Sequence, residues 1–194
     1  MNKKAENAAQ TRHALERAAR ELFEQRGFPE VSAEAIVAAA GVTRGALYHH
    51  YGGKEGLFEA VAEAAMQRLH ENVALAAAQA RGDPLAALRL GISRFLELAT
   101  APRLQRVLFI DAPTVLGWRR WREMDARYGL GMLLAGLQQA HAKGQIRSQD
   151  TRLLAHIVLS ALIEAAMMVA HAPVKTAARA EAEDMLLRLL AGLA

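Results

Sequence analysis

Residues 31–51 read VSAEAIVAAAGVTRGALYHHY, and this stretch decides how the chain folds. Ser32 and Thr43 are N-capping residue types, and each stands directly before a short run typical of a helix. Gly41 lies between the two runs and tolerates the positive φ that a tight turn requires. The stretch therefore predicts two short helices joined by a turn, which is the helix-turn-helix arrangement.

The apolar and polar residues of this stretch separate into an inner and an outer set. The residues spaced to pack the two helices together are Ile36, Ala40, Val42 and Leu47. The residues left exposed on the second helix are Thr43, Arg44, Gly45, Tyr48 and His49. A helix with such a polar face fits the major groove of DNA, with its N-terminal residues at the base edges.

The rest of the chain also favours helices. Hydrophobic residues make up 53% of the 194 residues and aromatic residues only 5%, and alanine and leucine, the strongest helix formers, are abundant. One helix is predicted before the quoted stretch, and a turn is expected at 111–113. The predicted helices outside residues 31–51 cover 8–26, 54–81, 84–100, 102–110, 117–141, 148–171 and 176–193. The sequence predicts an all-α protein of about nine helices.

Charge and composition exclude several classes. The net charge is +4, yet residues 1–55 hold eight Lys and Arg against seven Asp and Glu, so any DNA-binding charge must be local. Residues 41–54 contain no acid. The chain has no cysteine, which excludes disulfides and thiolate metal sites. The polar N-terminus does not resemble a secretory signal, and the apolar stretch 157–170 looks too short and too polar to span a membrane, so a cytoplasmic protein is expected.

The sequence between residues 11 and 61 resembles the TetR family of bacterial transcriptional regulators. The resemblance lies in five ordered segments: AARELF (18–23), RGF (26–28), AAGVT (39–43), GALYHHY (45–51) and KE (54–55). Two positions depart from the usual family pattern. Tyr51 replaces a more common phenylalanine and needs solvent or a partner for its hydroxyl, and Gly53 replaces a residue that often caps the next helix.

The resemblance implies a homodimeric repressor that binds a palindromic double-stranded DNA operator and is released by a small-molecule inducer, with no cofactor. It divides the chain into a DNA-binding domain, 1–53, and a ligand-sensing and dimerisation domain, 54–194. Residues expected at phosphates are Ser32, Thr43, Tyr48 and Lys54, and those expected nearest to base edges are Arg44, Gly45 and His49. Arg44 is the best candidate to recognise guanine, because its fork matches two acceptors.

The second domain has no comparably specific motif, so its ligand pocket is predicted from residue types. Both tryptophans and one of the three tyrosines fall between residues 111 and 131, and methionines suit an adaptable apolar pocket. The predicted lining residues are Met66, Trp118, Trp121, Met124, Tyr128 and Met167. The competing interpretation is that these side chains fill an ordinary core.

The predicted helix 148–171 is apolar on most of its circumference, which indicates burial on more than one side. The last helix carries leucines at matching spacing, and together the two predict a two-fold dimer interface. The predicted interface residues are His156, Leu159, Ser160, Ile163, Glu164, Leu186, Leu189 and Leu190. The alternative is the core of a monomer.

The sequence disfavours two other classes of function. An enzyme is disfavoured, because no metal-binding motif, phosphate loop or nucleophile motif occurs, and His156 and His171 would lie about 22 Å apart on one helix. The other alternative is a helical protein-interaction or ligand-binding module without specific DNA binding. The polar face of residues 43–49 argues against it.

Overall fold

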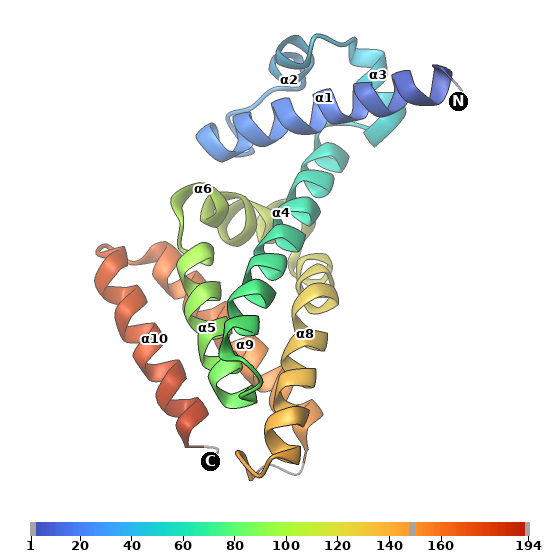
Figure 1. The fold of residues 1–194 in the computed structure, drawn as a ribbon. Coiled ribbons are helices and arrows are strands. Elements are labelled where there is room, and N and C mark those ends of the chain that lie inside the picture. Colours follow the sequence, from blue (N-terminus) through green and yellow to red (C-terminus); the bar gives the residue numbers. More distant parts are fainter. Residues whose placement is uncertain (1–2, 148–149, 193–194) are drawn as a thin grey trace.

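The computed structural model describes residues 3–147 and 150–192, and these residues form helices with no strand. The all-α prediction is confirmed. The chain folds into an N-terminal unit, made of α1 to α3, and a C-terminal bundle, made of α5, α8, α9 and α10 (Figure 1). The long helix α4 leaves the N-terminal unit and runs down into the bundle.

The N-terminal unit consists of α1 (Lys3–Arg26), α2 (Ala33–Ala40) and α3 (Arg44–Tyr51). The helix α1 begins five residues before the predicted start, and α2 and α3 match the prediction. Side chains from all three helices are fully buried in a common core: Leu15, Ala19, Phe23, Ile36 and Leu47. This core fixes the angle between α2 and α3.

The turn between α2 and α3 forms as its sequence predicts. Gly41 adopts φ 67°, in the left-handed region, and its N–H donates to the carbonyl of Ala38. The hydroxyl oxygen of Ser32 accepts from the N–H of Ala35, and that of Thr43 accepts from the N–H of Ala46. Both caps satisfy backbone donors that a helix N-terminus leaves free.

The helix α4 (Lys54–Ala77) starts without a side-chain cap, because Gly53 precedes it at φ 146°. The prediction that Gly53 leaves this helix poorly capped is therefore confirmed. A short 3-10 turn, η1 (Ala78–Ala80), ends this helix. Phe58 of α4 packs edge-on against both Phe23 and Phe28, so the first turns of α4 share the core of the N-terminal unit.

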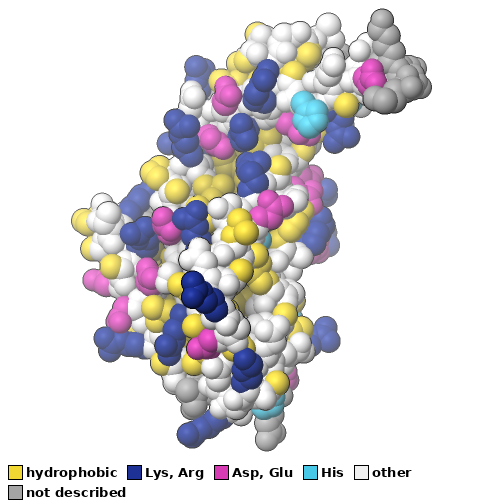
Figure 2. All heavy atoms as spheres, in the orientation of Figure 1, with side chains coloured by type: hydrophobic (Ala, Val, Ile, Leu, Met, Phe, Trp, Pro, Cys, Tyr) yellow, Lys and Arg dark blue, Asp and Glu magenta, His cyan; other side chains and the backbone are white. Residues whose placement is uncertain are grey.

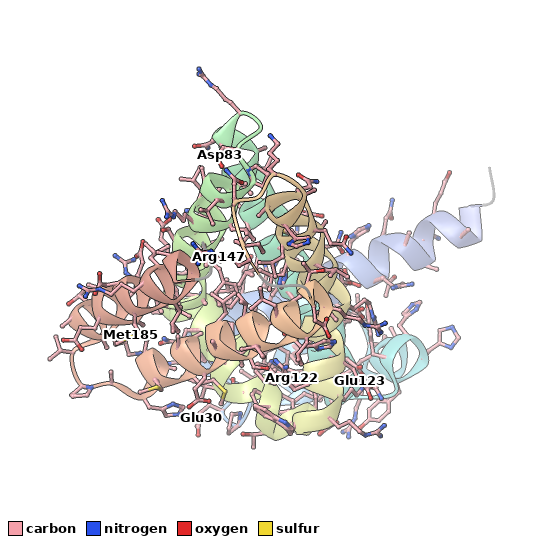
Figure 3. The ribbon with its side chains drawn as sticks, turned by 90° about the horizontal axis from the view of Figure 1, so that it is seen from below. Glu30, Asp83, Arg122, Glu123, Arg147 and Met185 are labelled. Carbon is pink, nitrogen blue, oxygen red and sulfur yellow. The ribbon has the colours of Figure 1, made fainter. Side chains whose placement is uncertain are left out.

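The C-terminal bundle consists of α5 (Pro84–Ala99), α8 (Trp118–Ala142), α9 (Thr151–His171) and α10 (Lys175–Ala191), within a few residues of the predicted helices. The predicted start at residue 148 and end at residue 193 lie outside the described residues. Figure 3, seen from below, shows α10, on which Met185 is labelled, at one edge of the bundle beside α9. The helix α4 packs against α5 and α8.

The segment before α8 corrects one prediction. The chain forms α6 (Pro102–Gln105), a π-helical turn η2 (Arg106–Asp111) and α7 (Ala112–Leu116), so the expected turn at 111–113 is helical. Proline is tolerated in the first turn of α7, where its missing N–H is not needed. The inner face of η2, including Leu108 and Phe109, is buried and holds the segment on the bundle.

The helix α9 also differs from its sequence-based description. It has 21 residues, and by length and composition alone it could cross a membrane, with a mean hydropathy of 2.1 over its most apolar window. The prediction concerned only residues 157–170, and the complete helix extends beyond that stretch at its N-terminal end. Core helices of soluble proteins pass the same test, and α9 packs on α8, α10 and α5.

Candidate nucleic-acid interface and effector cavity

The helix α3 turns one face to the core and the other to solvent. Leu47 is fully buried, whereas Arg44, Gly45 and His49 are exposed and Tyr48 is 48% exposed. A methyl group added at Gly45 would meet only the hydroxyl of Thr43, at 3.8 Å, so the backbone there is open to a close approach. The polar face predicted for this helix is thus free to meet another molecule.

Arg44 is held in place by neighbours on two helices. Its guanidinium lies 2.9 Å from a carboxylate oxygen of Glu34 on α2, donates to the hydroxyl of Tyr48 at 3.4 Å, and sits 5.5 Å from the centre of that ring. Exposed pairs of this kind contribute little stability. They orient the fork of Arg44 on the outer face of α3 without holding it strongly.

Lys54 faces inward, toward the loop between α1 and α2. Its ammonium donates to the carbonyls of Phe28 and Val31, at 3.1 and 3.0 Å, and lies 3.8 Å from the centre of the Phe28 ring. Two of its three protons are therefore used within the N-terminal unit. The structure makes Lys54 a tie for this loop, and the phosphate contact expected for it remains a prediction.

Tyr51 has the partner that its position requires. Its hydroxyl donates to a carboxylate oxygen of Glu16 on α1 at 2.6 Å, and the guanidinium of Arg12 lies 5.9 Å from the ring centre. Burial and the bond to Glu16 raise the pKa of Tyr51 to about 12, so the hydroxyl stays a donor. The residue ties α3 to α1.

On the face drawn in Figure 2 the charge is dispersed. Figure 2 shows Lys and Arg side chains scattered over this face of the molecule, with acidic side chains between them. The surface view agrees with the balanced count of charges over residues 1–55. Any attraction to DNA therefore depends on the few basic groups at α3 and on helix N-termini, rather than on a broad basic patch.

The N-terminal unit touches the bundle through η2. The side chain of Arg106 donates to the carbonyl of Gln25, near the end of α1, at 2.7 Å, and Asp111 accepts from the N–H of Phe28. Gly27, at φ 84°, lies between these two side chains. Phe109 of η2 packs edge-on against Phe95 and Trp121 in the bundle, so one short segment contacts both parts of the protein.

An apolar cavity of about 80 Å³ lies inside the bundle, between α4, α5, α8 and α9. One lining residue, His70, carries a ring nitrogen, and the rest are apolar. The lining residues are His70, Val73, Ala77, Ala87, Leu88, Gly91, Ile92, Phe95, Gly129, Met132, Leu133, Gly136, Leu159 and Leu162. Such a cavity suits a small apolar molecule.

None of the six residues predicted to line a pocket borders this cavity. Trp121 is fully buried and packs on Phe109, while Trp118 is 55% exposed. Met66 and Met124 are buried, and Tyr128 and Met167 are partly buried. Tyr128 contacts a lining residue, because its ring stacks on that of His70 with centres 6.2 Å apart.

The sequence reasoning missed the residues that shape the cavity. Gly129 and Gly136 lie seven residues apart on one face of α8 and remove side-chain volume where α8 meets α4 and α5. Glycine is unfavourable inside a helix, so two on one face are a signal that could have been used. The prediction instead placed the pocket around the aromatic residues near the N-terminal end of α8.

The eight residues predicted at a dimer interface fall into two groups. Leu159, Ile163, Leu186 and Leu190 are buried within the single chain. His156, Ser160, Glu164 and Leu189 are exposed. The same surface of α9 and α10 exposes further large apolar side chains, each more than half exposed: Leu153, Ile157, Met168 and Met185.

Asp125 is a fully buried carboxylate on α8. Burial raises its pKa to about 7, against the weaker opposing effect of Arg122, whose guanidinium lies 3.5 Å away. No donor among the described residues forms a hydrogen bond to either carboxylate oxygen. Arg122 also donates to the hydroxyl of Ser160, which ties α8 to α9.

A helix-turn-helix unit joined to a helical bundle with an internal apolar cavity defines a ligand-responsive DNA-binding regulator. Residues 16–61 match the family model described as bacterial regulatory proteins, tetR family, and residues 85–193 match the tetracyclin repressor-like C-terminal domain. The chain belongs to the TetR family of transcriptional regulators. It is a regulator and not an enzyme.

Relatives that match most of the chain are also transcriptional regulators. The transcriptional repressor BepR of Brucella suis biovar 1 is 29% identical over 175 residues, covering 84% of this chain and 81% of BepR. The regulator TtgR of Pseudomonas putida is 32% identical over 170 residues, covering 82% and 79%. The crystal structure of a TetR-family regulator from Pectobacterium atrosepticum superposes with a TM-score of 0.87 at 30% identity, covering 100% and 97%.

Proposed function

We propose that this protein is a homodimeric repressor that binds a palindromic operator through α3. Binding of a small apolar molecule in the cavity of the bundle then releases the operator. The observation that carries the proposal is the exposed face of α3. This face carries Arg44, Tyr48 and His49, and the opposite face of the helix is buried in the core of the N-terminal unit. Acting on DNA, the protein would work in the cytoplasm.

The contacts to DNA follow from this placement. The N-termini of α2 and α3 present backbone N–H groups and the hydroxyls of Ser32 and Thr43, which suit phosphate oxygens. Arg44 and His49 reach base edges, and Gly45 lets the backbone come close to them. Tyr48 donates to phosphate, and Lys54 supports the same surface by fixing the loop before α2.

The dimer is proposed from the exposed apolar surface of α9 and α10. Isolated exposed apolar residues are common, but several on two neighbouring helices indicate an interaction surface. Leu153, Ile157, Met185 and Leu189 belong to this set. A two-fold interface would pair the surface with itself and place the two α3 helices for two half-sites.

The division of the chain at residue 53 is part of the proposal. Gly52 and Gly53 both have positive φ between α3 and α4, so the chain changes direction there. The first turns of α4 still pack on Phe23 and Phe28, and α4 therefore belongs mechanically to both parts. The cavity lies farther along α4, from His70 to Ala77.

Effector binding in the cavity is supported by its apolar wall and by proteins of the same fold. SmeT was crystallised with triclosan, and FadR of Thermus thermophilus with lauroyl-CoA. Phe95 in the cavity wall touches Phe109 of η2, and η2 holds the N-terminal unit. A ligand that displaces Phe95 would therefore move η2 and change the separation of the two α3 helices.

DNase protection on the DNA upstream of the protein's own gene, at low salt and in 1 M salt, tests the proposal. We expect one protected site with two-fold symmetry and half-sites about 34–36 Å apart, or a multiple of this spacing, lost at high salt. A chain that protects no specific site in this or any neighbouring promoter would contradict it.

A further inference from the structure

The cavity wall contains one polar side chain. His70 lies on the inner face of α4 and is 6% exposed, and its ring is flanked by Tyr128 and Phe95, with ring centres 6.2 and 6.4 Å away. A few polar groups in an otherwise apolar pocket determine the specificity for a ligand. What His70 offers to the cavity therefore decides which molecule fits there.

The hydrogen bond that His70 makes within α4 fixes its tautomer. Its Nδ1 lies 3.0 Å from the carbonyl oxygen of Met66, and a carbonyl oxygen only accepts, so Nδ1 carries the proton. Burial lowers the pKa of His70, which keeps the ring neutral at neutral pH. The other nitrogen, Nε2, is then a bare acceptor, and no donor in the described part of the chain is bonded to it.

Gly129 lets the ring of His70 lie close against the backbone of α8 at the cavity wall. A methyl group added at Gly129 would lie 2.7 Å from Nε2 of His70 and 3.2 Å from the Leu159 side chain. Gly131, two residues farther along the same helix, would meet nothing within 4 Å. A side chain at 129 would therefore displace the His70 ring from its place in the cavity wall, whereas one at 131 would not.

We propose that the effector is a neutral, mainly apolar molecule of about one ring that carries a hydroxyl, and that this hydroxyl donates to Nε2 of His70. A phenol is the simplest such molecule. This inference rests on the proposal that the cavity is the effector site, and it adds the chemical class of the ligand.

Size and charge both restrict the class. A cavity of about 80 Å³ is small for a ligand pocket, although the flexible Met132 in its wall gives some adaptability. A carboxylate would bring a charge into an apolar wall and no donor for Nε2. An ether of the same shape would fill the cavity but leave Nε2 without a partner.

Isothermal titration of the full-length protein at pH 7.5 with three matched compounds tests the inference. The compounds are 4-ethylphenol, 4-ethylanisole and 4-ethylbenzoate, which share a ring and an ethyl group and differ in the polar group. We expect the phenol to bind about tenfold more tightly than the anisole, from one hydrogen bond to a buried acceptor, and the benzoate to bind most weakly.

Two variants connect this preference to the acceptor. His70→Phe removes Nε2 and should bring the phenol and the anisole to equal affinity. Gly129→Ala places a methyl group against Nε2 and should reduce the preference in the same way, while Gly131→Ala, the matched helix substitution into open space, should keep it. Because the readout is a ratio within each variant, a general change in affinity does not affect it.

The outcomes separate this inference from the proposed function. Equal affinity for phenol and anisole in the wild type, a preference that persists in His70→Phe, or no binding of any of the three compounds would overturn the inference. Binding with the expected preference, but without release of the operator by 4-ethylphenol, would support the chemistry of the cavity and contradict the proposed function instead.

Discussion

The carboxylate of Asp111, at the end of η2, accepts a hydrogen bond of 2.8 Å from the backbone N–H of Phe28, in the loop that follows α1. The two residues are 83 positions apart: Asp111 belongs to η2, which packs on the C-terminal bundle, and Phe28 belongs to the N-terminal unit. Burial raises the pKa of Asp111, while the bond to Phe28 and the nearby Arg106 oppose this rise. This contact couples the two parts of the protein.

Replacing Asp111 with alanine should weaken the coupling. The N–H of Phe28 loses its acceptor, so the free energy of unfolding should fall by about 1–3 kcal/mol. The effector should then cause less complete release of DNA, because η2 has lost its hydrogen bond to Phe28 and transmits less of its movement to the N-terminal unit. Thermal unfolding and effector titrations of the protein–DNA complex measure both effects.

Glu97→Ala, which removes an exposed carboxylate on α5, should behave as the wild type. An Asp111→Ala protein with unchanged effector response would contradict the coupling.

Lys54→Met should loosen the loop before α2. The carbonyls of Phe28 and Val31 lose their donor, so amide hydrogen exchange in residues 27–36 should increase. Lys143→Met is the matched control, since Lys143 donates to the carbonyl of Gly82 at the far end of the bundle. Unchanged exchange, together with weaker DNA binding and a smaller salt dependence, would instead assign Lys54 to phosphate contact.

Asp125→Asn should stabilise the protein at alkaline pH. The folded pKa of about 7 lies above the unfolded value of 3.8, so the folded wild type holds a proton that the unfolded chain releases. The stability of the wild type therefore falls as pH rises from 4 to 7 and stays low above 7. The variant escapes this loss, of the order of 2–4 kcal/mol.

Urea unfolding of the wild type and of Asp125→Asn at pH 5.5 and pH 8 measures this linkage. The gain from the substitution should be clearly larger at pH 8. Asp184→Asn, which changes an exposed carboxylate on α10, serves as the control and should show no such dependence. A gain that is equal at both pH values would show that Asp125 is already ionised in the folded protein at pH 5.5.

Ile157→Glu should break the dimer without unfolding the subunit. Ile157 is 55% exposed on α9, so a charge there is tolerated by the single chain but not in an apolar interface. Sedimentation velocity should show a monomer, and operator affinity should fall sharply because two half-sites are no longer bound together. Leu75→Glu, at a 69% exposed position on α4, should remain dimeric. A dimeric Ile157→Glu protein would place the interface elsewhere.

Local sequence signals predicted the N-terminal unit well. Ser32, Gly41 and Thr43 act over a few residues, and the caps and the left-handed turn form as expected. The helix at 111–113 was missed because proline and aspartate usually favour turns, while here Asp111 bonds to Phe28, far away in sequence.

The cavity could not be predicted in the same way. Its wall depends on which faces of four helices meet, and periodicity gives an apolar face without giving its partner. Trp121 satisfied the sequence criteria for a pocket, yet it fills the core against Phe109. His70, which lines the cavity, is not among the residues predicted from the sequence, because a single histidine on a long helix carries no local signal of a pocket.

The helix α3 is the element that we propose to read DNA. Fluorescence anisotropy with the protected upstream fragment, and with a scrambled fragment of equal length, tests this proposal most directly for the wild type and for Arg44→Ala. We expect the wild type to prefer the operator, and Arg44→Ala to lose about 1–3 kcal/mol of that preference while still binding both fragments weakly. Arg119→Ala, at an exposed position on α8, should match the wild type. An Arg44→Ala protein with full operator preference, or a wild type with none, would contradict the account.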